Sequence, residues 1–546
     1  MAVRKEDVIL KNLPLPAAEY IRLVIKKMRY RKKVRSEVMA ELAGHFEDEL
    51  KDCKTEEEKE QKAKQLIEQF GDPKLLSVLL RRAKKRCRPL WKKVLVQTSK
   101  IIGLLFLYIV IRLIFLATGS PSINTDYIEW LNKLVAAGRP EAENARMNYN
   151  KAAELYVKMP AEIVEKSHTL IDTDFNKWFA DLNDLQRETF TKWLADNQQS
   201  FEAFRQGSEK PYYWPIYEGQ KSGQPLQGNS AFYDTNMWSK RRVIAQAMKY
   251  QIIYDEYEGK EVDALNDCLI LLRYGTHLEG KGLLNEQLVG IAIEALAINS
   301  TSRLLQKQDI PIDTLKDFRT RLESIICNAG PILTLEVEKA FWYDLIQRGF
   351  TDDGKGNGRA LSQGLPLVTK DALNSITGFF FWNFPDRREC TATIDDYFAK
   401  AGNLLEKSPY ELHQKGESQI WNELGKQSVM LKLLGPVHGR VGEWNWRIKA
   451  QRTALRTIIS LLIYEKEKGS YPTNLDELVS SGFLKSLPMD PWSDKPLVYK
   501  KTETGFTLYS VGLNFKDDGG VMGTDEEGKP RMWAENGDWV FWPVAK

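Results

Sequence analysis

The chain has 546 residues, of which 43% are hydrophobic and 28% are charged, and its formal net charge is +4. This length excludes a single globular domain, because one hydrophobic core stops growing at roughly 250–300 residues. The charge is also uneven, since residues 1–100 sum to +11 and residues 118–546 sum to −8. We therefore expect a basic N-terminal head followed by a mildly acidic body.

Residues 1–93 are expected to form a small helical bundle, because apolar residues in 16–50 recur every three or four positions. The later stretch FGDPKLL predicts a junction between two helices. Gly71 can end one helix in the left-handed conformation, Asp72 can cap the next, and Pro73 suits its first position. The pattern RSEVMAELAGHFEDEL, with TEEE and FGDPKLL after it, resembles the HAAS or permease-prefix domains of bacterial membrane proteins. The resemblance implies a signalling or regulatory role without catalytic residues.

One transmembrane helix is predicted within residues 94–118. The run IIGLLFLYIVIRLIFLA, residues 101–117, is apolar apart from Arg112. As a helix it covers roughly 25 Å of a bilayer core about 30 Å thick, and Arg112 lies close enough to the far end to reach the interface. The alternative is a buried helix of a soluble domain.

Nine basic residues and no acidic residue lie between Arg81 and Lys100. The positive-inside rule then predicts a signal anchor with the head in the cytoplasm and the bulk of the chain outside. The resemblance to domains of bacterial membrane proteins implies that this membrane is the bacterial cytoplasmic membrane. Nucleic-acid binding is the rival interpretation, and we expect none this close to a membrane. The basic residues expected to meet the membrane and its anionic lipid headgroups are Arg81, Arg82, Lys84, Lys85, Arg86, Arg88, Lys92 and Lys93.

Residues 119–445 are dominated by helical periodicity, which predicts a large outer domain of helical hairpins, solenoid-like but without a strict repeat. Two irregular segments interrupt it. The first contains Tyr212, Tyr213, Trp214 and Tyr217, which could form a stacking platform for a sugar or peptide or could instead cover helix ends. The second, RGFTDDGKGNGRALSQGLP, lacks P-loop and EF-hand spacing and is interpreted as a mobile surface loop.

No catalytic constellation stands out, because the sequence contains no HExxH motif and no GxSxG elbow. Glu336 and Glu338 are one carboxylate pair to weigh for glycoside hydrolysis. Residues two apart on a helix do not face each other, so a charged, solvated helix face is the preferred interpretation. We therefore expect no enzyme, although an activity stays open.

Residues 446–546 are expected to form an α+β module. A long helix should end at Gly469, and a short one should follow at residues 475–479. Strands are expected at residues 497–500 and 506–511 and near the C-terminus. This order resembles the soluble domain of major type II secretion pseudopilins. The residues that carry the resemblance are Gly469, Tyr471, Pro472, Leu475, Leu478, Asp490, Pro491, Trp492, Tyr499, Ser510, Gly512, Gly519 and Gly520.

The chain departs from pseudopilins because no membrane segment or prepilin-peptidase motif begins this helix. In that family the loop after the last Ser binds calcium, which prefers six to eight oxygen ligands. The resemblance thus implies a calcium site, with a metal-free glycine loop as the alternative. The side chains that could supply oxygens are Asn514, Asp517, Asp518, Asp525 and Asp538.

Taken together, these patterns predict a mainly α-helical, single-pass bacterial membrane protein with an interaction or envelope-scaffold role and an envelope protein as partner. A transmembrane sensor that passes an external state to the head is the second hypothesis. A cell-wall hydrolase is the third, and it would need two carboxylates facing each other in a cleft.

Overall fold

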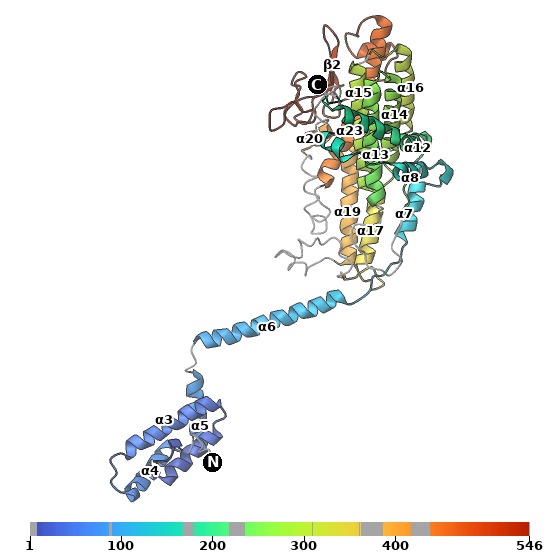
Figure 1. Ribbon diagram of the computed structural model, residues 1–546. Coiled ribbons are helices and arrows are strands. Elements are labelled where there is room, and N and C mark those ends of the chain that lie inside the picture. The colour runs from blue at the N-terminus through green and yellow to red at the C-terminus, as the bar shows by residue number, and fades with distance from the viewer. Residues whose placement is uncertain are drawn as a thin grey trace. The chain divides into compact units, whose positions relative to one another are not determined.

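The computed structural model describes residues 8–86, 90–167, 178–179, 181–217, 235–307, 309–359, 361, 386–416 and 437–544. In these ranges the chain is mainly helical, with 19 α-helices and one small three-stranded sheet (Figure 1). It forms two compact units, Met1–Phe115 and Leu116–Lys546. The prediction of a mainly helical fold is confirmed, whereas the solenoid-like arrangement stays a prediction.

The first unit is a bundle around a single apolar core that includes Ile21, Val24 and Phe46. Gly71 has φ +70° after one helix, and Asp72 accepts a hydrogen bond from the N–H of Lys74 (2.7 Å) at the start of the next. The predicted junction is therefore confirmed. The helices are α2 (Leu15–Lys27), α3 (Lys32–Leu50), α4 (Glu56–Phe70) and α5 (Pro73–Arg86).

Two helices are long and apolar enough to cross a membrane, judged by length and composition. Helix α6 (Leu90–Ala117) contains the window Val94–Ile111, with mean hydropathy 2.1 and no part of it buried. Helix α15 (Leu284–Lys307) has mean hydropathy 1.3, and 61% of its window is buried among other helices. By length and composition, both helices are candidates for a membrane span. They differ in burial, because the α15 window is mostly enclosed by other helices and the α6 window is not.

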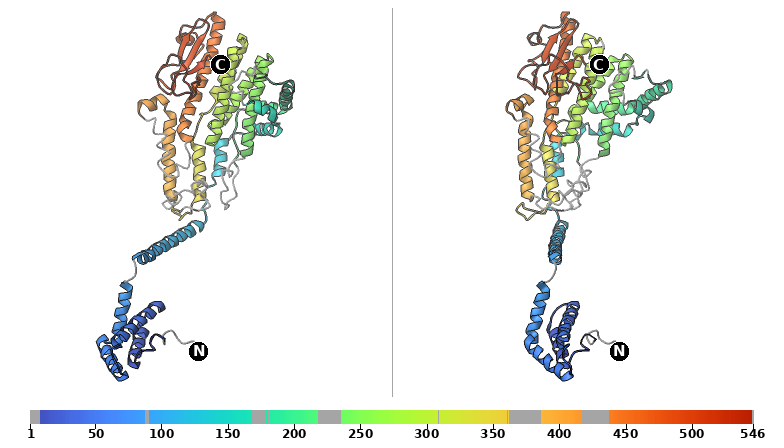
Figure 2. Two further views of the ribbon diagram at one scale, coloured as in Figure 1. Left: turned by 60° about the vertical axis from the view of Figure 1, so that its left-hand side comes forward. Right: turned by 90° about the vertical axis from the view of Figure 1, so that its left-hand side faces the viewer.

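The second unit is built on long helices that lie side by side (Figures 1 and 2). Helix α15 packs between α14 and α23, and α13 and α16 pack against α14. Its helices, besides α15, are α7 (Tyr127–Ala136), α8 (Arg146–Leu155), α9 (Ala161–Ser167), α11 (Asp184–Asp196), α12 (Gln198–Glu209), α13 (Thr235–Tyr257), α14 (Glu261–Leu278), α16 (Ile312–Asn328), α17 (Glu336–Gly349), α19 (Arg387–Glu406), α20 (Pro409–Gln414), α23 (Val437–Lys468) and α24 (Asp476–Ser480).

One continuous apolar core runs from Ala145 on the helical side to Trp542 in the sheet. The expected boundary between residues 445 and 446 falls inside α23, which packs on α15 and α16 and also on the sheet. The C-terminal residues therefore do not form a separate compact unit. A helix that buries two faces joins the layers on either side of it, and the predicted division of the outer region stays a prediction.

The sheet has the antiparallel order β1 (Val498–Lys501), β2 (Phe506–Ser510) and β3 (Trp539–Trp542). These strands and the short helix α24 lie within about one residue of the predicted ranges. Asp490 explains why the Asp-Pro-Trp turn and the Ser-x-Gly turn occur together. Its carboxylate accepts hydrogen bonds from Trp492 N (3.1 Å), Ser510 Oγ (2.7 Å) and Val511 N (3.1 Å). One buried carboxylate thus joins the turn before β1 to the end of β2.

Candidate functional site

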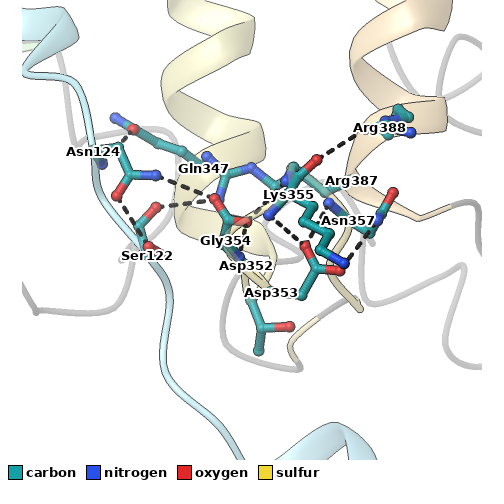
Figure 3. Close-up of polar contacts among 12 residues, drawn as sticks. Ser122, Asn124, Gln347, Asp352, Asp353, Gly354, Lys355, Asn357, Arg387 and Arg388 are labelled. Carbon is teal, nitrogen blue, oxygen red and sulfur yellow. Dashed lines mark hydrogen bonds and ion pairs between the residues drawn. The ribbon is translucent and has the colours of Figure 1, made fainter.

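Residues 118–125 follow α6 in the chain and open the second unit, and we call them the linker. Gln347, buried on α17, binds the backbone of the linker through both ends of its amide (Figure 3). Its Oε1 accepts from Asn124 N (3.2 Å) and Thr125 N (3.3 Å), and its Nε2 donates to Thr125 O (2.7 Å). A second bond to Asp344 Oδ1 (2.8 Å) orients this amide. The contacts of Gln347 with the linker are therefore made to the linker backbone and do not depend on linker side chains.

Two arginines bind linker carbonyls farther toward its start. Arg359 Nη2 donates to Thr118 O (2.8 Å), and Arg387 Nη1 donates to Ser122 O (3.3 Å). Hydrogen bonds from a charged donor are roughly twice as strong as neutral ones. The two arginines are 28 residues apart in the sequence, so segments that are distant in the chain meet on the linker.

Asp352 lies at the centre of these contacts (Figure 3). Its Oδ1 accepts from Gly354 N (2.9 Å) and Gly356 N (3.2 Å), and its Oδ2 accepts from Arg387 Nη1 (2.9 Å) and Asn124 Nδ2 (3.1 Å). The Asp352 and Arg387 side chains are 9% and 14% exposed. One carboxylate thus joins its own turn, α19 and the linker. We call Gln347, Asp352, Arg359 and Arg387, with the linker, the linker clasp.

The turn itself is ordered by a second carboxylate. Asp353 Oδ1 accepts from Lys355 N (2.8 Å) and Asn357 N (3.0 Å), and these bonds lower the pKa of Asp353. Gly354 and Gly356 supply the positive φ values that the turn needs. Residues 351–359 of this segment form a hydrogen-bonded turn, in which two carboxylates accept from four N–H groups, and the mobility of the segment stays a prediction.

Sequence reasoning missed the linker clasp. The Asp-Asp-Gly sequence was the only local indication of a structured turn, because Asp side chains often accept hydrogen bonds from backbone N–H groups two residues later. Gln347 and Arg387 carry no such sign, because their role depends on what the fold brings beside them. The donors and acceptors of the linker clasp bind groups of the protein itself, chiefly backbone N–H and C=O groups of the linker.

The proposed stacking residues lie mostly in the core. Tyr213, Trp214 and Tyr217 are buried, and Tyr217 donates to Glu286 Oε2 (2.6 Å) near the start of α15. Only Tyr212 is partly exposed. The structure therefore corrects the platform of four rings and favours the alternative in which they cover helix ends, because three rings have no free face.

Glu338 points inward rather than into solvent. It accepts from Leu284 N (3.0 Å) at the start of α15 and from Trp342 Nε1 (3.3 Å), and burial raises its pKa. Glu336 is exposed. The interpretation of a solvated helix face thus holds for Glu336 and is wrong for Glu338, which caps a neighbouring helix.

The C-terminal acidic residues bind mainly backbone groups. Asp538 accepts from Asp518 N (3.2 Å) and Gly520 N (2.6 Å). Asp517 accepts from Tyr509 Oη (2.8 Å) and from the next glycine N–H. Burial, reinforced by the two neighbouring acids, raises the pKa of Asp538.

The other two predicted calcium residues lie around this loop. Asn514 donates to Asp518 Oδ2 (2.6 Å), and Asp525 closes its own turn by accepting from Glu527 N (3.0 Å) and Lys529 N (2.9 Å). In the part of the chain that the structure describes, no group of three or more His, Cys, Asp or Glu is placed to hold a metal ion. In this arrangement the five residues do not meet as one ligand set, and the calcium site stays a prediction.

The basic residues before α6 fall in two helices. Arg81, Arg82 and Lys85 are exposed on α5, and Lys84 pairs with Glu41 (2.5 Å). Arg86 ends α5, Lys92 and Lys93 belong to α6, and Arg88 lies outside the described residues. Their contact with lipid headgroups stays a prediction.

Comparison of the chain with family models, curated proteins and solved structures finds no match. The resemblances to permease-prefix domains and pseudopilins therefore remain expectations based on the quoted residues.

Proposed function

We propose that the chain is a single-pass membrane protein whose second unit acts outside the cytoplasmic membrane as an interaction or scaffold domain. The observation that carries this is that no residue in the apolar window of α6 is buried, while the window of α15 is mostly buried. An exposed helix of this hydropathy has bilayer lipid as its natural surroundings. The exposed cations on α5 support an orientation with the head in the cytoplasm.

Exposed apolar residues on the second unit support an interaction role. Trp130 on α7 is 44% exposed and Met147 on α8 is 61% exposed. Trp and Met are enriched where proteins bind one another. The partner we expect is another envelope protein.

A membrane fractionation experiment tests the anchor. Replacing Leu104 and Leu107 by Lys costs about 3 kcal/mol of insertion free energy for each residue near the helix centre, so the protein should leave the membrane fraction. Val262→Lys is the matched control, because Val262 is an exposed apolar residue of α14. Retention of the double variant in carbonate-washed membranes would contradict the anchor.

The partner is tested separately. In crosslinked membranes, Trp130→Ala should reduce recovery of a bound envelope protein, and Leu185→Ala, at another exposed apolar site on α11, should not. Equal recovery from both variants and the parent would argue against this surface.

The linker clasp supports a sensor as the second candidate. The clasp ties the residues that follow α6 to the turn after α17 and to α19, so a change in these elements would reach the linker. In this case a clasp variant, Asp352→Asn, should alter the cytoplasmic response while the amount of protein in the membrane stays the same. A response that persisted unchanged after deletion of residues 1–80 would count against a sensor.

A further inference from the structure

Two cationic side chains converge on the ring of Tyr212. The guanidinium carbon of Arg139 lies 4.5 Å from the ring centroid, and Lys281 Nζ lies 5.8 Å from the same centroid. Arg139 follows α7, and Lys281 lies in the turn between α14 and α15. The fold therefore brings the two cations together from segments about 140 residues apart in the sequence.

Glu279 acts electrostatically on Lys281, one of these two cations, but forms no ion pair with it. In the described part of the chain, neither side chain forms an ion pair or a hydrogen bond with a carboxylate. Glu279 lies two residues before Lys281, but its Oε2 binds Arg452 at 2.5 Å in the core. Arg146, a nearby arginine in the sequence, does have a carboxylate partner, because its Nη2 lies 3.2 Å from Glu141 Oε1.

One neighbouring carboxylate, Glu279, opposes the lowering of the Lys281 pKa, whereas His277 and Arg273 add no negative charge. His277 lies at the end of α14, where burial lowers its pKa to about 3, and its Nδ1 lies 2.8 Å from Tyr149 Oη. Arg273 on the same helix is a further cation, and it also acts on His277. Burial and then the charge of Arg139 lower the pKa of Lys281 to about 8. The protein thus holds two like charges together where an anion would relieve their repulsion.

We propose that Arg139 and Lys281, which both contact the ring of Tyr212, form a binding site for an oxyanion, the phosphate or carboxylate group of a ligand. The planar guanidinium can bind two oxygens of such a group, and the Lys ammonium supplies a point charge. The Tyr212 ring holds both cations in place by cation–π contact. The site goes beyond the proposed scaffold role and does not depend on it.

Chemical modification of the full-length protein in detergent tests the site without any substitution. An amine-reactive reagent at about pH 8 should modify Lys281 roughly tenfold faster than Lys133, because a pKa of about 8 leaves much of the Lys281 amine unprotonated. Lys133 is the control, since it is 74% exposed and pairs with Glu129. Mass spectrometry of the peptides gives both rates.

Inorganic phosphate and succinate are the two probes, each compared with sodium chloride at equal ionic strength. If only phosphate slows the modification of Lys281, the ligand carries a phosphate group, and if only succinate slows it, the ligand carries a carboxylate group. If both probes slow it, the site binds oxyanions in general. In each case the modification of Lys133 should not change. Unchanged modification of Lys281 with both probes, or equal slowing at Lys133, overturns the proposal.

A variant tests whether both cations are required. Arg139→Ala should raise the concentration of anion needed for protection on the order of tenfold, and Arg139→Lys should restore part of the affinity. Lys133→Ala should leave protection unchanged. Protection that is the same in Arg139→Ala and the parent overturns a site made by two cations.

Discussion

Two loops of this protein contain the sequence Asp-Asp-Gly, at residues 352–354 and 517–519, and they serve different ends. In both, carboxylates accept backbone N–H bonds and glycines take positive φ. In the first loop Asp352 is also balanced by Arg387 and joined to the linker. In the second, Asp538 adds a further acid, and the negative charges gather. The same tripeptide therefore becomes a clasp or an acid-rich turn according to the charges that distant segments bring.

The largest effect should come from Gly358→Ala in the first loop. A Cβ at this position would lie 1.6 Å from Thr351 O, so the backbone of the turn would have to separate. We expect a loss of about 3 kcal/mol in the free energy of unfolding and fast hydrogen exchange at the Asn124 and Thr125 amides. Gly354→Ala is the control, because a Cβ at this position meets nothing within 4 Å. Its only expected loss in the free energy of unfolding is about 1 kcal/mol, from placing a residue with a side chain at positive φ. Equal losses in the two variants would refute the clash.

Asp352→Asn should have the next largest effect, because it leaves the mostly enclosed Arg387 guanidinium without its carboxylate. The expected loss is about 2 kcal/mol, measured by urea unfolding. Arg387→Gln in the same background should cost little more, since the pair is already broken. Fully additive losses would show that the two side chains do not act together.

Tyr509→Phe should have a smaller effect, confined to the second loop. It removes the hydroxyl that donates to Asp517 at 2.8 Å, for a loss of about 1 kcal/mol. The Asn124 and Thr125 amides should keep their exchange rates, which serve as the internal control. A change at those amides would mean that the two loops are coupled.

The smallest effect is a pH dependence of opposite sign in the two loops. Backbone N–H bonds, first that of Lys355, lower the pKa of Asp353, so its contribution is present above its unfolded pKa and is lost as pH falls through its folded pKa. Burial raises the pKa of Asp538, so its contribution is present below its unfolded pKa and is lost as pH rises through its folded pKa.

Unfolding midpoints between about pH 3 and pH 7 measure this difference. Asp353→Asn should weaken the acid-side loss of stability, and Asp538→Asn should weaken the loss that accompanies rising pH. If both substitutions changed the pH dependence of the unfolding midpoint in the same direction, the two loops would not differ in the way proposed.

Local features were predicted well because their causes lie within a few residues. The junction at Gly71 and Asp72 needs one left-handed glycine and one cap. Strands β1 and β2 follow from apolar alternation between turn residues. The packing of α23 against both the helices and the sheet was not predicted, because a hydrophobic period does not identify the element that a helix face contacts.

By itself, the sequence determined the apolar helix, the basic head and the helix and strand periods, because each depends on neighbours in the chain. Only the tertiary structure decided that Asp352 meets Asn124, 228 residues away, that Glu338 caps α15, and that Arg139 and Lys281 share one ring. The reason is physical. Charges and hydrogen-bonding groups act over a few ångströms, and which groups come that close is set by how the cores pack.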